Sequence, residues 1–184
     1  MFRKVRNMIE LLIGKIDKIS EILSDDPFSL TFMDITKNTN EEQFTNSENS
    51  HLKDYYLITN RYERLIGGVI NISSQRKFAD IQFYVEEMQR FDGDWICIGK
   101  IEMYPLFINK ENGQVTCLFG DPLDQNYVLE SYGDFNNFLL NYFLGEQYGE
   151  IGLKLVESGG SINTVGSKED EWYKMLEENG LLTQ

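Results

Sequence analysis

Residues that commonly carry catalysis or bind metals are scarce in this sequence. There is one histidine, His51, in a polar stretch, and the two cysteines, Cys97 and Cys117, lie within separate apolar runs. These residues fall short of a zinc ligand set, and the cysteine spacing fits no C-x-x-C redox pair. A catalytic triad needs a base held against a Ser or Cys nucleophile, and nothing around His51 suggests such an arrangement. We therefore expect His51 in solvent and both cysteines as small buried hydrophobic side chains.

Phosphate-binding loops, membrane spans and export signals are missing as well. Neither G-x-G-x-x-G nor G-K-[ST] occurs in the chain, which argues against the common nucleotide-binding loops. No run approaches the roughly 18 apolar residues of a spanning helix. The basic N-terminal segment is not followed by an A-x-A-like cleavage site. These absences predict a cytoplasmic protein without metal or cofactor, in which the cysteines are not expected to form a disulfide.

Carboxylates are the one reactive group present in quantity. Paired carboxylates catalyse glycoside hydrolysis across a cleft, but acids in turns normally serve turn geometry and solvation. Residues 121–126 also lack the spacing of an EF-hand loop, so a turn is expected there. Hydrolysis by two carboxylates stays open as a minor alternative. The candidate groups are Glu86 with Glu87, Asp92 with Asp94, Asp121 with Asp124, and Glu169, Asp170 and Glu171 in the tail.

Length and composition predict one folded domain with an acidic surface. The 184 residues are 41% apolar and 13% aromatic, which is typical of a globular domain with a well-filled core. The net charge is −13, and Glu10 and Asp17 are the only acids in the first twenty positions. Such a surface repels nucleic acid and anionic membranes and speeds encounter with a basic protein. It is equally compatible with solubility alone.

Hydrophobic periodicity predicts a helix at each end of the chain. Apolar residues follow helical spacing over residues 3–23. In the tail, Ser167 and Asp170 resemble a capping box, Trp172 lies on an apolar face, and Gly180 follows the expected end. Docking of this tail onto the domain is the preferred arrangement. The single expected domain, 1–184, comprises an N-terminal helix (1–27), a core (28–157) and a helical tail (158–184).

Alternating and β-branched runs predict strands through the middle of the chain. Gly67-Gly68 indicates a bulge or a close backbone approach, and Asn112-Gly113 indicates the positive φ angles of a hairpin turn. Residues 37–50 are polar and are expected to form a loop. Residues 79–88 suit either a strand or a helix, and a strand is preferred. The expected strands are 28–36, 55–59, 65–72, 79–88, 95–101, 104–109 and 114–119.

The stretch 92–143 holds the most informative order of features and no recognisable catalytic constellation. A strand and a hairpin are followed by a helix with Asp134 as N-cap and an apolar stripe from Phe135 to Phe143. This order is similar to the SUKH superfamily, bacterial immunity proteins related to yeast cell-wall-synthesis regulators. In that family a strand resembling W-I-C-I-G precedes a hairpin resembling L-F-I-N-K-E-N-G-Q-V-T-C-L and a short F-x-x-F-L helix. The first fifty residues lack the family's L-P-x-x-Y-x-x-F-L segment.

The resemblance implies an α+β fold, with a mainly antiparallel sheet of about five or six strands and helices packed against it. It also implies binding rather than catalysis, because such proteins neutralise secreted toxins, often nucleases, by direct association. We expect an immunity-type protein whose partner is a basic toxin domain; a regulatory or scaffold module for another cellular protein is the alternative. Acids on exposed turns would mimic phosphates in the partner's cleft. These acids are Asp92, Asp94, Asp121, Asp124 and Asp134.

Overall fold

The computed structural model describes residues 2–25, 33–39, 48–120, 127–159 and 164–183. The strands in this part of the chain form one antiparallel sheet. The strands pair in chain order, each antiparallel to the next. The expected α+β class with an antiparallel sheet is confirmed, and in this part of the chain the sheet has seven strands instead of about five or six. They are β1 (Met33–Lys37), β2 (Tyr62–Gly67), β3 (Ile70–Ile72), β4 (Trp95–Ile101), β5 (Tyr104–Asn109), β6 (Gln114–Phe119) and β7 (Val128–Asp134).

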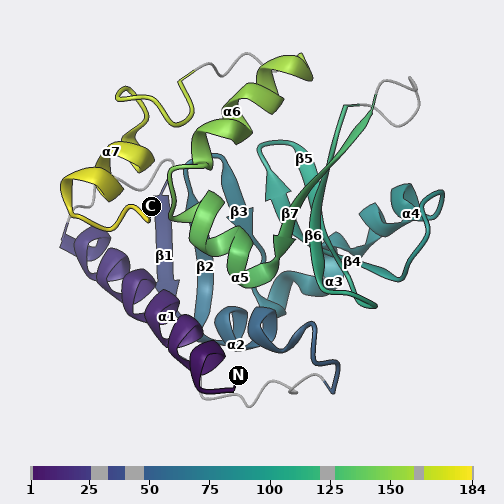
Figure 1. The fold of residues 1–184 in the computed structure, drawn as a ribbon, viewed down its shortest axis with the longest axis horizontal. Coiled ribbons are helices and arrows are strands. Elements are labelled where there is room, and N and C mark those ends of the chain that lie inside the picture. Colours follow the sequence, from purple (N-terminus) through teal and green to yellow (C-terminus); the bar gives the residue numbers. More distant parts are fainter. Residues whose placement is uncertain (1, 26–32, 40–47, 121–126, 160–163, 184) are drawn as a thin grey trace.

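Helices pack on both sides of this sheet (Figure 1). Two 3₁₀ turns, Gln75–Lys77 and Gln82–Tyr84, flank α3, and a π-helix, Phe138–Phe143, continues α5. Among the residues described, none of the helices combines the length and the apolar character that crossing a membrane requires. The α-helices are α1 (Phe2–Asp25), α2 (Lys53–Arg61), α3 (Phe78–Ile81), α4 (Val85–Met88), α5 (Phe135–Asn137), α6 (Tyr148–Glu157) and α7 (Glu171–Glu178).

Alternate side chains of the central strands enter two different cores. In β4, Ile96 and Ile98 join the main core, whereas Cys97 between them packs with Phe107 and Leu118 on the opposite face. Helices α1, α2, α5, α6 and α7 contribute to the main core, and the helical segment containing α3 and α4 covers the smaller one. Both faces of β4 to β6 are therefore buried over most of their length, whereas Lys100 near the end of β4 is exposed. The two cysteines are buried and free, as expected.

The C-terminal helix docks on the domain, as the sequence predicts. Trp172 is fully buried, and its Nε1 donates a hydrogen bond to the Phe143 carbonyl at 2.9 Å. The N-cap of α7 is Asp170, whose side chain accepts from the backbone N–H groups of Trp172 and Tyr173. The prediction of Ser167 in a capping box is wrong, because its hydroxyl instead accepts from the Glu169 N–H within the preceding turn.

Segments before and after the sheet meet directly. Lys15 Nζ of α1 donates to the Leu181 carbonyl and to the Thr183 hydroxyl, each at 2.8 Å. Thr183 also forms an isolated parallel bridge with Gly145. The C-terminal segment thus lies between α1 and the turn that follows the π-helix.

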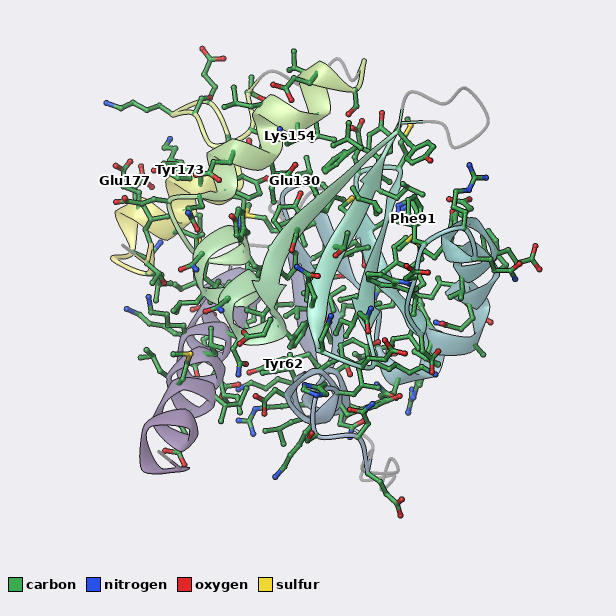
Figure 2. The ribbon with its side chains drawn as sticks, turned by 45° about the vertical axis from the view of Figure 1, so that its right-hand side comes forward. Tyr62, Phe91, Glu130, Lys154, Tyr173 and Glu177 are labelled. Carbon is green, nitrogen blue, oxygen red and sulfur yellow. The ribbon has the colours of Figure 1, made fainter. Side chains whose placement is uncertain are left out.

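Helix α6 has one side in the main core and contacts β7 near the beginning of that strand. Tyr148 and Leu155 are fully buried. On its other side, Lys154 Nζ lies 3.6 Å from the Glu130 carboxylate of β7 and 3.2 Å from that of Glu157 (Figure 2). The segment Tyr148–Glu157 is therefore an amphipathic helix.

Two segments predicted as strands are helical. Residues 55–59 belong to α2, and residues 79–88 form α3, a 3₁₀ turn and α4. Their buried residues recur at helical intervals, so that one side of each segment faces a core. In α2 these residues are Tyr55, Ile58 and Thr59. In the second segment Met88 is fully buried, and Ile81, Tyr84 and Val85 are partly buried.

The predicted strand at residues 65–72 is in fact the end of one strand and all of the next. β2 ends at Gly67, β3 begins at Ile70, and Gly68 has a φ of +56° in the turn between them. The hydroxyl of Tyr148 accepts a hydrogen bond from the Val69 N–H at 3.1 Å. The close backbone approach is confirmed, but the bulge is not.

The predicted hairpin and the helix after it are confirmed with two changes. Of the turn residues, Gly113 has a positive φ of +77° and Asn112 does not. Asp134 is the N-cap of α5, but from Phe138 to Phe143 the helix is a π-helix, which ends with the Leu144 N–H donating to the Leu139 carbonyl. Of strand 28–36 the structure describes the part from residue 33, and residues 40–47 of the predicted loop lie outside the described residues.

An ionic cluster joins α1, α2 and β1. The Asp17 carboxylate accepts hydrogen bonds from Arg61 at 2.6 Å and Tyr62 at 3.0 Å and lies 3.1 Å from Lys37 Nζ. Burial alone would raise the pKa of Asp17. The hydrogen bonds from Arg61, Lys37 and Tyr62 outweigh burial and hold this pKa below its usual value.

We expect Asp17→Asn to remove part of the acid sensitivity of folding. Because the pKa is lower in the folded state, its stabilisation is present above the unfolded value of about 3.9 and is lost as pH falls through the folded value. The substitution should cost about 1 kcal/mol at neutral pH and little in strong acid. Urea unfolding across this pH range measures the difference. Glu21→Gln, an exposed change on the same helix, is the control, and an equal cost of Asp17→Asn at every pH would contradict the prediction.

Candidate functional site

The strand register brings the described predicted acids to one end of the sheet. β4 and β6 begin, and β5 and β7 end, at this end, because neighbouring strands are antiparallel. Asp92 and Asp94 immediately precede β4, and Asp134 is the last residue of β7. All three are exposed. Asp121 and Asp124 lie outside the described residues.

The start of α2 extends this surface, which we call the acidic end. Asn49 Nδ2 donates to the Lys110 carbonyl at 2.9 Å, so the segment before α2 adjoins the β5–β6 turn. Asn136 Nδ2 donates to the Asp54 carboxylate at 2.6 Å, which joins α2 to α5. The described carboxylates of the acidic end are Glu48, Asp54, Asp92, Asp94, Glu111 and Asp134, and its described lysines are Lys53 and Lys110.

The three described predicted acids differ in their local partners. The Asp94 carboxylate forms an ion pair with Lys110. Asp134 accepts a hydrogen bond from the Asn137 N–H at 2.8 Å, which caps α5. For the Asp92 side chain no partner is recorded among the described residues, and its carbonyl accepts from Trp95 Nε1 at 3.2 Å. Asp92 is therefore the acid most available to a partner, while Asp134 also stabilises its helix.

The residues considered for metal or nucleophilic chemistry lie in different environments: His51 is exposed, and the two cysteines are buried. His51 is exposed, as expected, beside the hairpin turn at Gly113. Burial raises the pKa of Cys97 to about 11 and that of Cys117 well above its usual value, so both thiols stay protonated. Within the described ranges, no group of three or more His, Cys, Asp and Glu side chains is arranged to hold a metal ion.

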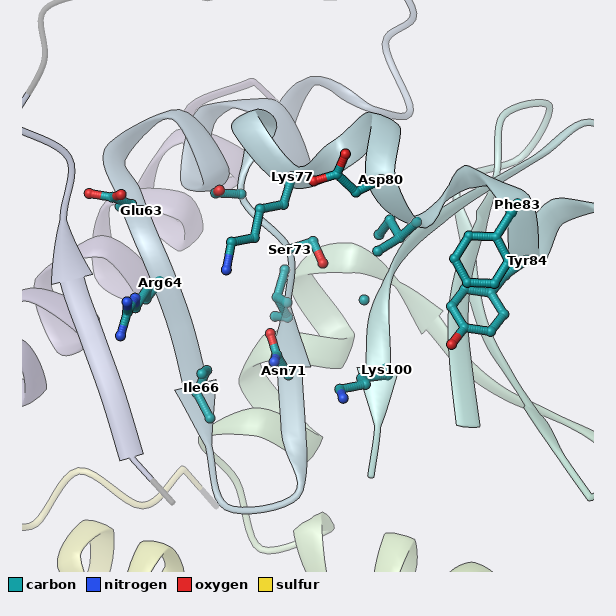
Figure 3. A pocket seen from close by; sticks show the side chains of 14 residues that line it. Glu63, Arg64, Ile66, Asn71, Ser73, Lys77, Asp80, Phe83, Tyr84 and Lys100 are labelled. Carbon is teal, nitrogen blue, oxygen red and sulfur yellow. The ribbon is translucent and has the colours of Figure 1, made fainter. Parts of the chain in front are cut away.

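A cavity of about 480 Å³ opens on the sheet face opposite the main core, beside α3 (Figure 3). Its floor is a row of side chains from three strands: the register places Ile66 opposite Asn71 and Asn71 opposite Lys100. The helical segment that covers β4 to β6 forms its wall through Ile81, Phe83 and other residues. The volume lies within the roughly 300–1,000 Å³ typical of small-molecule sites.

Two ion pairs lie at the rim of this cavity. Arg64 of β2 donates to the Asp34 carboxylate of β1 at 2.7 Å. The neighbouring Glu63 lies 3.7 Å from Arg76, in the 3₁₀ turn. Each of these charges is paired with an opposite charge, so the two ion pairs add no net charge to the cavity. They connect the residues at its rim to neighbouring elements.

Sequence reasoning did not single out the cavity. Its residues come from β2, β3, β4 and the helical segment that follows β3, and each is unremarkable in its own segment. One signal was present: Lys100 interrupts the otherwise apolar run W-I-C-I-G-K-I of β4. A lysine within such a strand indicates that one position of the face is open to solvent.

Comparison of the chain with protein-family models, with curated proteins and with solved structures found no match. Function is therefore inferred from the residues and their arrangement.

Proposed function

We propose that the chain is a non-catalytic immunity-type protein that neutralises a cognate toxin by direct association, as its resemblance to the SUKH superfamily implies. The partner is a basic domain such as that of a nuclease. One observation carries the proposal: exposed acids from segments far apart in the sequence converge at the acidic end. The exposed acids are Glu48 before α2, Asp92 and Asp94 before β4, Glu111 in the β5–β6 turn and Asp134 at the end of β7.

The electrostatics of this surface suit a cleft that binds phosphates. Carboxylates at the ends of strands and helices are held by rigid elements, so little ordering is needed when a partner binds. Attraction between the chain of net charge −13 and a basic domain raises the association rate about tenfold or more. The same charge repels the phosphates of nucleic acid, which a basic toxin would otherwise bind.

Neutralising the three described predicted acids tests the proposal. The variant Asp92→Asn, Asp94→Asn, Asp134→Asn removes their charge, and asparagine keeps the N-cap at residue 134 because it caps as well as aspartate. We expect its association rate with the toxin to fall about tenfold and to depend less on salt. The partner to test is the product of the gene that neighbours this chain's gene, and surface plasmon resonance measures the rate.

A matched variant controls for net charge. Glu21→Gln, Glu169→Gln, Glu177→Gln removes the same charge from exposed acids outside the acidic end. Equal association rates for the two triple variants would refute the choice of residues. If the neighbouring product neither binds nor becomes harmless on co-expression, the immunity function is refuted. Stable binding of a non-toxin cellular protein through the same acids would instead support a regulatory or scaffold module.

A further inference from the structure

The hydroxyl of Ser74 is a buried polar group that lacks a partner. Ser74 lines the cavity beside α3 and is 5% exposed. It immediately precedes the 3₁₀ turn Gln75–Lys77 but makes no capping hydrogen bond, and its Oγ has no hydrogen-bond partner among the described residues. Buried hydroxyls in folded proteins are satisfied by protein, water or ligand in the great majority of cases. The Ser74 hydroxyl is therefore an unpaired hydrogen-bonding group in the wall of the cavity.

Two lysines face the same cavity. Lys77 extends from the helical segment above the strands, and Lys100 projects from β4 (Figure 3). No ion pair is recorded for either lysine with any residue of the described part of the chain. Beyond the two rim ion pairs, Asp80 is the one carboxylate among the described lining residues. The lining groups outside the rim pairs thus sum to a positive charge, in contrast to the strongly acidic chain.

An aromatic pair borders the cavity on its other side. Phe83 is 61% exposed, and its ring centroid lies 4.0 Å from that of Tyr84, with the ring planes 33° apart. Figure 3 shows the two rings one above the other, across the cavity from Arg64 and Glu63. Aromatic faces stack favourably on planar groups. The exposed ring of Phe83 can therefore contact the apolar part of a bound molecule.

From these features we propose that the cavity binds a small organic anion with a planar apolar body. Its phosphate or carboxylate group is held by Lys77, Lys100 and the Ser74 hydroxyl, since charged donors bind such groups most strongly. The planar body lies against Phe83. This site is on a different surface from the acidic end, and it does not depend on the proposed immunity function.

Calorimetric titration of the full chain tests the site with three probes: phenyl phosphate, benzoate and inorganic phosphate. We expect saturable binding of phenyl phosphate or benzoate, and the preferred one identifies the anionic group. Inorganic phosphate should bind more weakly because it lacks the planar body. Lys77→Gln with Lys100→Gln should weaken binding about tenfold or more, since each lysine contributes a charge-assisted hydrogen bond. Phe83→Ala should weaken phenyl phosphate more than inorganic phosphate.

The control is Lys53→Gln with Lys168→Gln, which removes the same charge at exposed positions outside the cavity and should leave the affinity unchanged. Equal affinities of the two double variants would overturn the proposal, as would a lack of saturable binding for all three probes at millimolar concentration. Amide chemical shifts of the unsubstituted protein give a second measurement that does not depend on variant folding. Changes centred on residues 71–77 and 99–100 support the site, and changes confined to other residues overturn it.

Discussion

Replacing Trp172 with alanine should lower the free energy of unfolding by about 3–5 kcal/mol. The side chain is fully buried in the main core, and its ring centroid lies 5.1 Å from that of Phe143. Its Nε1 also donates to the Phe143 carbonyl at 2.9 Å. The substitution therefore leaves a cavity between α7 and the π-helix together with an unpaired buried carbonyl. Urea unfolding followed by circular dichroism measures the loss.

Two further variants separate these contributions. Trp172→Phe keeps most of the ring but removes the donor, so it should cost about 1–3 kcal/mol. Trp95→Ala removes a ring that is only partly buried in the smaller core, and it should cost less than Trp172→Ala. A Trp172→Ala protein no less stable than the Trp95→Ala protein would contradict the packing of α7 described above.

Gly68→Ala should lower the free energy of unfolding by about 2–4 kcal/mol, for two reasons. Gly68 has a φ of +56°, a conformation that residues with a Cβ atom rarely adopt. An added Cβ would also lie 1.9 Å from the Tyr148 hydroxyl, which is fully buried with its ring. The turn between β2 and β3 would have to move away from α6. Thermal and urea unfolding both report the change.

A glycine elsewhere in the chain isolates the conformational cost. Gly180 has a similar φ of +61°, but a Cβ at that position would meet nothing within 4 Å. Gly180→Ala should therefore cost about 1–2 kcal/mol, the backbone contribution alone. Tyr148→Phe removes the clashing oxygen and should make Gly68→Ala less costly in the double variant. Equal losses in the free energy of unfolding for Gly68→Ala and Gly180→Ala would contradict the predicted steric clash with Tyr148.

The sequence was sufficient for elements whose signals are local and strong. The long helical stripe of α1, the hairpin of β5 and β6, and the cap at Asp134 all depend on residues near one another in the chain. The two helical segments predicted as strands are short and rich in aromatic and β-branched residues, which favour strands. Tertiary contacts decide such cases: the rings of Tyr55 and Phe135 meet edge to face at 5.4 Å, which holds α2 against α5.

The candidate surfaces required the register of the strands. Exposed turns could be identified as acidic, but their common position at one end follows only from which strand ends are neighbours. The cavity was harder to predict from the sequence than the acidic end. The residues that line it, between Glu63 and Lys100, come from three strands and a helical segment. Its most telling group, the Ser74 hydroxyl, is distinguished by a missing hydrogen bond, and a sequence does not record hydrogen bonds.

The contact between Lys15 and Leu181 has a consequence for the order of folding. Every strand pairs with its neighbour in the chain. The longest connections between paired strands, residues 38–61 and 73–94, are still far shorter than the whole chain, so the sheet can grow through comparatively local contacts, which form fast. Lys15 and Leu181, by contrast, are separated by 166 residues, and their meeting closes a loop around the whole sheet. Folding can therefore start at any hairpin of the sheet. It is complete only when α1 and the C-terminal segment, which flank the sheet in the sequence, are in contact.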